Sequence, residues 1–355
     1  MKDLPTILFR CDASSQIGFG HVVRCIALGE EFRRQGCHVS FAMKEGPTGM
    51  EMVKSHGFPV YNSPLIGSSD EYREWMCEIY DALKPDSLIL DVRDDLPRSI
   101  LKSFKNKGML VVTIDDPSDR RLDADLAFYP PVPQVHKADW EEFSGELYSG
   151  WEWIILRPEF SLPDSIPSHS PPVVLVTMGG SDPAGFTLKS VAALDALDEE
   201  FDTIIVLGPG FVHGKALQKI LKGARRRYEI RKSVVDMPAL LAQVDVAVVA
   251  FGMTAYEVAA MGIYAMYLCL TEDHVESAST LEAAGFGTNL GLGHAVKEWV
   301  IGQRVACLLL DQTMRSSVFD KAREVFRSKG INNIVQTVIE RHRVIDEQHH
   351  RMANA

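Results

Sequence analysis

Short apolar runs alternate with longer amphipathic segments along the first part of the chain. The amphipathic segments span about residues 20–35, 72–83 and 98–107, and Gly36 follows the first of them, where a left-handed residue ends a helix. Continuously apolar strands separated by helices indicate a parallel sheet that is covered on both faces. The predicted strands are residues 6–11, 38–43, 87–91 and 110–114.

The pattern changes between residues 129 and 172, where prolines crowd among serines and charged residues. This segment is interpreted as the crossing between two domains, with residues 151–156 as an apolar strand inside it. A second series follows, with a helix at 187–197 and a helical region from about residue 297 onward. Its predicted strands are residues 172–178, 203–207, 245–250 and 263–270.

Length supports two domains, because 355 residues exceed what one hydrophobic core usually organises. The predicted fold class is α/β, with two Rossmann-like domains whose parallel sheets face each other across a cleft. We expect residues 1–150 to form the N-terminal domain and 151–340 the C-terminal domain. The polar residues 341–355 are expected to form a fraying tail.

Charge and cysteine usage narrow the function classes. A net charge of −11 disfavours extended nucleic-acid binding, and the Arg225–Arg227 run is interpreted as a solvated helix end. Backbone N–H groups at helix starts still allow an acidic protein to bind a diphosphate. The six scattered cysteines contain no C-x-x-C pair, which favours a reducing compartment without structural zinc. We therefore expect a soluble cytoplasmic protein without a signal peptide or membrane span.

The first candidate site follows the first strand, in the motif from Asp12 to Arg24. Gly18 and Gly20 permit close backbone approach, and His21 falls at the start of a helix, where a neutral imidazole can act as a general base. The alternative is that His21 is a capping or packing residue in a tight turn. The dinucleotide fingerprint G-x-G-x-x-G is absent, so NAD binding is not expected.

Two later strand-to-helix turns have the composition of phosphate-binding loops. In the first, Gly179 and Gly180 permit backbone approach, Ser181 offers a hydroxyl, and Asp182 is interpreted as a cap of the next helix. The structural alternatives are a plain β-to-α connection for this first turn and, for the second turn, a surface glutamate at Glu257 that pairs with a neighbour. In the second turn, the amides of Met253 and Thr254 follow Gly252, and Glu257 lies one helical turn further, where it can accept hydrogen bonds from ribose hydroxyls.

Charged residues follow other predicted strands. Asp91 and Arg93 end one strand, Asp115-Asp116 another, and Asp273-His274 a third. Paired carboxylates bind metals or cap helices, and without a ligand cluster no metal is expected. His213 lies in a Gly-Pro-Gly loop and is interpreted as structural or solvent-exposed.

The motif Arg10-Cys-Asp-Ala-Ser-Ser-Gln-Ile-Gly-Phe-Gly-His-Val-Val-Arg-Cys resembles the opening of the nucleotide-sugar hydrolases of pseudaminic acid biosynthesis and the related spore-coat polysaccharide proteins. The stretches 176–183 and 252–262 are similar to the same family, so the likeness covers most of the chain in order. The resemblance implies the two-domain glycosyltransferase B fold.

The resemblance also implies roles for single residues. Gly180, Ser181 and Thr254 would contact the diphosphate of UDP, Glu257 would bind the ribose, and the backbone from Val235 to Met237 would contact uracil. The N-terminal domain would bind the sugar, and His21 would activate water that attacks the anomeric carbon, without metal or cofactor. The remaining predicted contacts are, for the sugar, Asp12, Gly18, Gly20, Arg24, Asp91, Arg93, Asp273 and His274, and, for the nucleotide, Gly179, Gly252 and Met253.

Two positions depart from the family. Arg93 stands where the hydrolases commonly have tyrosine, and Asp273-His274 stands where they have Asn-Gln. The sugar and the acceptor therefore stay open. A UDP-sugar hydrolase is the leading hypothesis, and a glycosyltransferase, a hydrolysing epimerase and a non-catalytic nucleotide-sugar binder are the alternatives.

Overall fold

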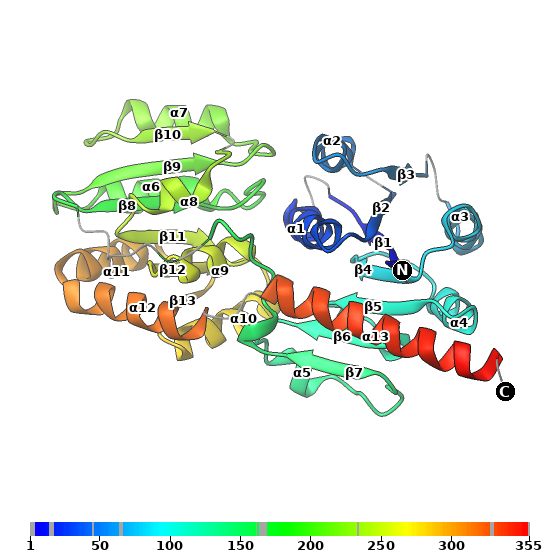
Figure 1. Ribbon diagram of the computed structural model, residues 1–355. Helices are drawn as coiled ribbons and strands as arrows, with labels where there is room; N and C mark the ends of the chain where they lie inside the picture. The colour runs from blue at the N-terminus through cyan, green and yellow to red at the C-terminus, as the bar shows by residue number, and fades with distance from the viewer. Residues whose placement is uncertain are drawn as a thin grey trace. The chain divides into compact units, whose positions relative to one another are not determined.

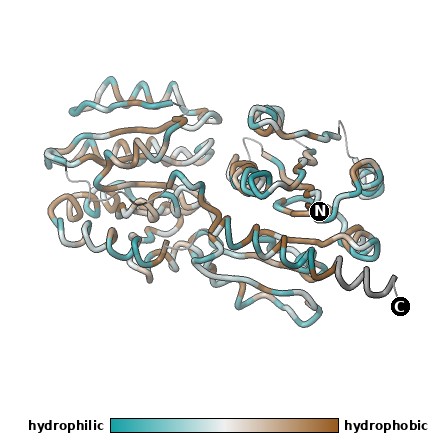
Figure 2. Tube along the Cα trace, viewed as in Figure 1, coloured by the Kyte–Doolittle hydropathy of each residue, from teal (hydrophilic) through white to brown (hydrophobic). Residues whose placement is uncertain are grey.

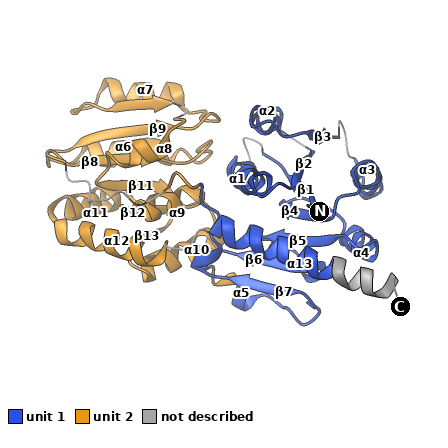
Figure 3. Ribbon diagram, in the orientation of Figure 1, with its two compact units in different colours: residues 1–131, 135–157, 329–355 blue, residues 132–134, 158–328 orange. Residues whose placement is uncertain are grey.

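The chain forms two compact units. The computed structural model describes residues 4–13, 18–44, 46–63, 67–160, 162, 169–232, 234–326 and 330–353. The first unit contains residues 1–131, 135–157 and 329–355, and the second contains residues 132–134 and 158–328 (Figure 3). Each unit is built on one parallel sheet with helices (Figure 1).

The sheet of the first unit has the strand order β3-β2-β1-β4-β5-β6-β7. Its strands are β1 (Thr6–Cys11), β2 (His38–Met43), β3 (Val60–Asn62), β4 (Ser87–Asp91), β5 (Leu110–Ile114), β6 (Leu126–Tyr129) and β7 (Glu146–Ser149). Its helices are α1 (Gly20–Arg34), α2 (Pro47–Ser55), α3 (Ser69–Leu83), α4 (Arg98–Asn106) and α13 (Gly330–Ala353), with 3-10 turns at Asp119–Asp123 and Trp151–Trp153 and a short α5 (Gln134–Lys137) at the unit boundary.

Alternate residues of the central strands enter two different cores. Ile7 and Phe9 of β1 pack on the face that α1 and α13 cover, whereas Leu8 packs on the face that α3 and α4 cover. A strand that is buried on both faces has no polar alternation, so it is continuously apolar. The predicted strands 6–11, 38–43, 87–91 and 110–114 are confirmed as β1, β2, β4 and β5.

The sheet of the second unit has the order β10-β9-β8-β11-β12-β13. Its strands are β8 (Val173–Thr177), β9 (Asp202–Leu207), β10 (Glu229–Lys232), β11 (Val246–Ala250), β12 (Tyr264–Cys269) and β13 (Gly287–Leu292). Its helices are α6 (Phe186–Asp195), α7 (Gly214–Lys222), α8 (Met237–Leu241), α9 (Met253–Ala260), α10 (Glu272–Ala283), α11 (Glu298–Leu310) and α12 (Gln312–Val325).

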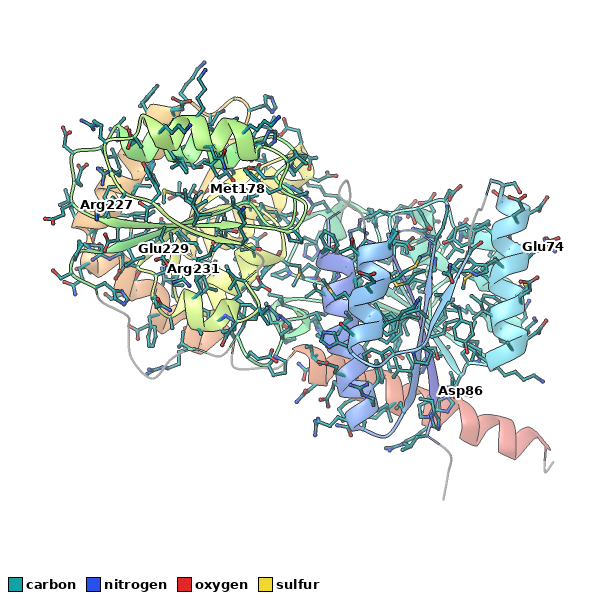
Figure 4. All side chains as sticks on the ribbon, turned by 90° about the horizontal axis from the view of Figure 1, so that it is seen from above. Glu74, Asp86, Met178, Arg227, Glu229 and Arg231 are labelled. Carbon is teal, nitrogen blue, oxygen red and sulfur yellow. The ribbon has the colours of Figure 1, made fainter. Side chains whose placement is uncertain are left out.

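The edge of the second sheet is charged. Glu229 and Arg231 project from β10 and form an ion pair, and all four residues of this strand are exposed (Figure 4). Hydrophobic positions concentrate on the central strands instead (Figure 2). Charged side chains on an edge strand oppose pairing with another chain.

Arg225 and Arg226 precede β10. They donate hydrogen bonds to backbone carbonyl oxygens of Asp195, Leu197 and Glu199, at and just after the end of α6.

The C-terminal helix differs from the predicted domain boundaries. We expected residues 151–340 in the second unit and a fraying tail, whereas α13 runs to Ala353 and belongs to the first unit. Its apolar stripe, with spacings of three and four residues, is buried in the first core. The side chain of Asn333 also donates to the carbonyl of Glu152 at 2.9 Å. The stripe consists of Ile331, Ile334, Val335, Val338 and Ile339.

The apolar run 151–156 is not the predicted strand. It opens with a 3-10 turn, because Trp153 packs its ring on Tyr148 of β7 and Phe128 of β6, with centroid distances of 4.6 and 5.2 Å. Within the proline-rich crossing, residues 161 and 163–168 lie outside the described residues.

Candidate active site

The strand order of each sheet reverses at one place. In the first unit β1, β2 and β3 run outward and β4 returns beside β1, and in the second unit β11 returns beside β8 in the same way. Ligands of parallel α/β sheets bind at the carboxyl ends of the strands that flank such a switch point. The predicted residues that follow β1 and β4, and those that follow β8 and β11, therefore lie at the two switch points.

His21 lies at the first switch point, as the second residue of α1. Gly18 before it has φ 80°, in the left-handed region that favours glycine, and Gly20 begins the helix. His21 Nδ1 lies 2.6 Å from Oδ1 of Asp91, the last residue of β4. Because an ionised carboxylate only accepts, Nδ1 carries the proton and Nε2 retains its lone pair. Residues 14–17 of this motif lie outside the described residues.

Helical spacing brings Arg24 and Cys25 to the same carboxylate, since they follow His21 by three and four residues. Arg24 donates from Nε to Oδ2 of Asp91 at 2.5 Å and from Nη2 to Oδ1 at 2.6 Å. Cys25 Sγ donates to Oδ2 at 3.5 Å. This bidentate geometry is the strong form of a charge-assisted pair.

Asp91 is held in its charged form. Burial alone raises the pKa of its carboxyl, but the charge of Arg24 and the hydrogen bonds that Arg24 and His21 donate outweigh burial, so the pKa lies well below its usual range. The side chain of Asp91 is fully buried and that of Arg24 is 9% exposed, whereas His21 is 17% exposed. We expected substrate contacts from Arg24 and Asp91. In the structure the two side chains bind each other, and we propose that both residues position His21.

Arg93 and Asp115 connect the loops after β4 and β5. Arg93 donates from Nη2 to Oδ2 of Asp115 at 2.9 Å and from Nη1 to its backbone carbonyl. Asp115 has φ 51°, which costs a non-glycine residue roughly 1–2 kcal/mol. Arg24 Nη1 also lies 3.6 Å from the same carboxylate oxygen. About a third of the Arg93 side chain is exposed, so it stays a proposed sugar contact.

A second ion network, which was not predicted, lies beneath the same loops. Arg10 of β1 is fully buried and donates to Tyr72 Oη and Asp94 Oδ2, both at 2.7 Å. It also pairs with Asp12 Oδ2 at 2.6 Å, while Asp12 Oδ1 accepts from the amide of Lys44. Asp12 thus holds the β1 loop, although a sugar contact was predicted for it. This network could have been predicted from the sequence, because Arg10 stands inside an apolar run and a buried charge requires partners.

In the second unit the β8–α6 turn presents its backbone. Figure 4 labels Met178 where β8 ends, and Gly179 follows it with φ 72°. Asp182 accepts from the amides of Phe186 at 2.8 Å and Thr187 at 2.9 Å, which confirms its predicted capping role. These bonds occupy the first amides of α6, and the amides of Gly180 and Ser181 stay the proposed anion contacts.

Replacing Asp182 with alanine is expected to lower the free energy of unfolding by about 1–2 kcal/mol, since both capping bonds are lost. Urea unfolding measures the change. Asp198→Ala is the control, because its side chain is 93% exposed and it should alter stability by less than about 0.5 kcal/mol. Equal effects of the two substitutions would contradict the capping role.

The β11–α9 turn lies across the switch point from the β8–α6 turn. Gly252 precedes α9 and has no side chain with which to cap this helix, so the first-turn amides at Met253 and Thr254 stay the proposed anion contacts. Gly252 has extended backbone, and a Cβ there would meet no atom within 4 Å, so the fold does not require glycine. Glu257 lies one turn along α9 and is half-buried.

The remaining predicted contacts lie at the same edge of the second sheet. Val235, between β10 and α8, is 91% exposed, whereas Met237 is buried, and the backbone of both stays a proposed nucleotide contact. Asp273 and His274 lie in the first turn of α10, where the Thr271 hydroxyl accepts from the His274 amide at 3.2 Å.

Within the described ranges of the chain, no group of three or more His, Cys, Asp or Glu side chains is arranged to hold a metal ion. None of the helices in those ranges combines the length and apolar character that a membrane crossing requires.

Comparison with known proteins gives relatives in sequence. No family model matches the chain. It is 24% identical over 326 residues to the spore coat polysaccharide biosynthesis protein SpsG of Bacillus subtilis (strain 168), which covers 90% of this chain and 94% of SpsG. A protein of Methanocaldococcus jannaschii is 26% identical over 275 residues, and this match covers 74% of the chain and 55% of that protein.

Solved structures share the fold. MurG of Acinetobacter baumannii superimposes with a TM-score of 0.70 at 16% identity, over 95% of this chain and all of MurG. The UDP-GlcNAc 2-epimerase of Neisseria meningitidis, bound to UDP-GlcNAc, gives 0.66 at 10% identity, over 94% of this chain and all of the epimerase. The predicted α/β fold class is confirmed: the chain shares the glycosyltransferase B fold of these structures and is similar in sequence to SpsG.

Proposed function

We propose that this chain hydrolyses a UDP-linked amino-deoxy sugar at its anomeric C–O bond and releases UDP, in surface polysaccharide or nonulosonic acid biosynthesis. The His21–Asp91 pair at the first switch point carries the proposal, because it is a base oriented by a buried carboxylate. Two comparisons support it. SpsG is named for polysaccharide biosynthesis, and one structural neighbour was solved with UDP-GlcNAc.

His21 Nε2 takes a proton from water while the water oxygen attacks the anomeric carbon. The bond between that carbon and the β-phosphate oxygen breaks, and UDP leaves. Asp91 keeps the Nδ1 proton in place and stabilises the imidazolium that forms. Arg24 keeps Asp91 ionised and fixed, so the pair does not reorganise during the proton transfer.

The second unit binds the nucleotide in this proposal. Amides at Gly180, Ser181 and Thr254 contact the diphosphate, and the carboxylate of Glu257 accepts from the ribose hydroxyls. Charge that develops on the departing diphosphate is stabilised by these fixed dipoles. The backbone from 235 to 237 contacts the uracil.

A glycosyltransferase is the second candidate, because several structural neighbours are glycosyltransferases. In that reaction His21 Nε2 deprotonates an acceptor hydroxyl instead of water, and the other roles are unchanged. The same base serves hydrolysis and transfer, so the His21–Asp91 pair fits both reactions.

Incubation with UDP-GlcNAc and with diamino-trideoxy UDP-sugars, without acceptor, separates the candidates. We expect equal amounts of UDP and free sugar, with no products from His21→Ala. Substrate that stays intact until an acceptor is added indicates transfer, and a free sugar with inverted C2 indicates a hydrolysing epimerase. Tight binding without turnover indicates a non-catalytic binder.

The nucleotide assignment has its own test in thermal unfolding. UDP at a hundred times its dissociation constant should stabilise the protein by about 2.7 kcal/mol, and uridine at the same concentration by much less, because it lacks the diphosphate. CDP is the comparison for the base. Equal stabilisation by uridine and UDP would argue against a diphosphate site.

A further inference from the structure

The β8–α6 turn directs its carbonyl groups toward a neighbouring loop. The carbonyl of Gly180 accepts from the amide of Gly210 at 2.8 Å, and the carbonyl of Asp182 accepts from Nε2 of His213 at 3.0 Å. Both donors lie between β9 and α7, in the segment from Gly208 to His213, which we call the support loop. Since a carbonyl oxygen only accepts, His213 carries its proton on Nε2.

The hydrogen bond to the Gly180 carbonyl also fixes the direction in which the following amide, that of Ser181, points. In a trans peptide the N–H of Ser181 points opposite to the carbonyl of Gly180. That carbonyl points to the support loop, which follows β9, so the Ser181 amide points away from it. β9 and β11 flank β8 on opposite sides, and the Ser181 amide is therefore directed to the β11 side, where the switch point lies.

The two loops touch backbone to backbone. A Cβ at Gly208 would lie 2.4 Å from the carbonyl oxygens of both Gly179 and Gly180, and a Cβ at Gly210 would lie 3.1 Å from Cβ of Ser181. Gly208 is therefore required by space, because a side chain there would displace the turn, whereas a side chain at Gly210 would make a tight contact with Ser181.

The β8–α6 turn also needs support from outside. Gly179, Asp182 and Gly185 have φ of 72°, 48° and 69°, and Asp182 is a non-glycine residue in the left-handed region. The side chain of Asp182 accepts from the Phe186 and Thr187 amides at the start of α6. The backbone carbonyl of Asp182 accepts from the His213 ring. His213 immediately precedes α7, and its backbone carbonyl accepts from the Leu217 amide, which anchors His213 to this helix.

We propose that His213 and the support loop position the β8–α6 turn so that its amides face the nucleotide diphosphate. His213 is a positioning residue, since its ring bonds to protein backbone. The inference rests on the proposed function, because it assumes that the turn binds a diphosphate. From the sequence alone, His213 was interpreted as structural or solvent-exposed.

The test is the ratio of UDP to uridine affinity, measured by calorimetry on the full chain. His213→Ala should reduce this ratio on the order of tenfold, the effect of one lost hydrogen bond, and leave uridine affinity unchanged. His213→Gln should restore most of the ratio, because its amide donates from a similar position. Val212→Ala, on the same loop and 72% exposed, should not change it.

Gly208→Ala should lower the ratio as His213→Ala does, and it replaces that variant if the latter does not fold. Equal losses of UDP and uridine affinity, or an unchanged ratio in His213→Ala, would overturn the inference. A wild-type protein that binds UDP no more tightly than uridine would instead reject the diphosphate site, and with it the proposed function.

Discussion

Replacing His21 with alanine is expected to lower the turnover number for UDP-sugar cleavage by a factor of about 10²–10⁴, the usual contribution of a general base. The reason is geometric: Asp91 binds Nδ1 at 2.6 Å, so Nε2 is the atom that accepts the proton. UDP affinity should not change, because the proposed nucleotide contacts belong to the second unit. Steady-state kinetics and UDP titration measure the two quantities.

His56→Ala is a matched control. His56 also pairs through Nδ1 with a carboxylate, Glu30, at 2.7 Å, but both side chains are more than 40% exposed. Turnover should stay near the wild-type value in this variant. Nearly normal turnover in His21→Ala would reject His21 as the base.

Replacing Arg24 with methionine is expected to lower the free energy of unfolding by about 3–5 kcal/mol at neutral pH, because it leaves the Asp91 carboxylate buried without its partner. Chemical denaturation of the first unit reports the loss. Arg24→Lys should recover only part of it, since lysine cannot donate to both carboxylate oxygens in the bidentate geometry.

The same helix supplies the control for this variant. Arg34 is bidentate to Glu31 at 2.7 and 2.6 Å but 66% exposed, and Arg34→Met should leave the free energy of unfolding nearly unchanged. Equal costs of the two substitutions would show that burial of the Arg24 pair does not matter.

The pH dependence has a definite sign. The pKa of Asp91 is lowered in the folded wild type, so its contribution is complete above the unfolded value of 3.8 and is lost as the pH falls below it. The difference in unfolding free energy between the wild type and Arg24→Met should therefore shrink as the solution becomes acidic. A constant difference down to pH 3 would contradict the assignment.

Hydropathy patterns located most of the strands that lie inside the sheets. β1, β2, β4 and β5 were predicted with their observed bounds, because each is buried on both faces and is largely apolar. The four edge strands β3, β7, β10 and β13 were missed, and so was the internal strand β6, which has only four residues. An edge strand such as β10, Glu-Ile-Arg-Lys, is exposed along its whole length and has no apolar run. Their pairing depends on neighbours that are distant in sequence.

In the candidate site, too, some features could be identified from the sequence and others could not. The strand-to-helix turns at Gly18–His21, Gly179–Ser181 and Gly252–Thr254 were identifiable, because glycine next to a strand end is a local signal. The partners of these turns were not, since a side chain on α1 meets a carboxylate on β4 only after the chain has crossed the sheet.

By itself the amino-acid sequence determined the α/β class, the positions of the central strands and the glycine-rich turns, because each is a property of neighbouring residues. Only the tertiary structure decided that Asp91 and Arg24 pair with each other, that His213 supports the β8–α6 turn and that α13 belongs to the first unit. These choices depend on burial and on contacts across a sheet, where the free energy of a charge or an apolar stripe is set by residues far along the chain.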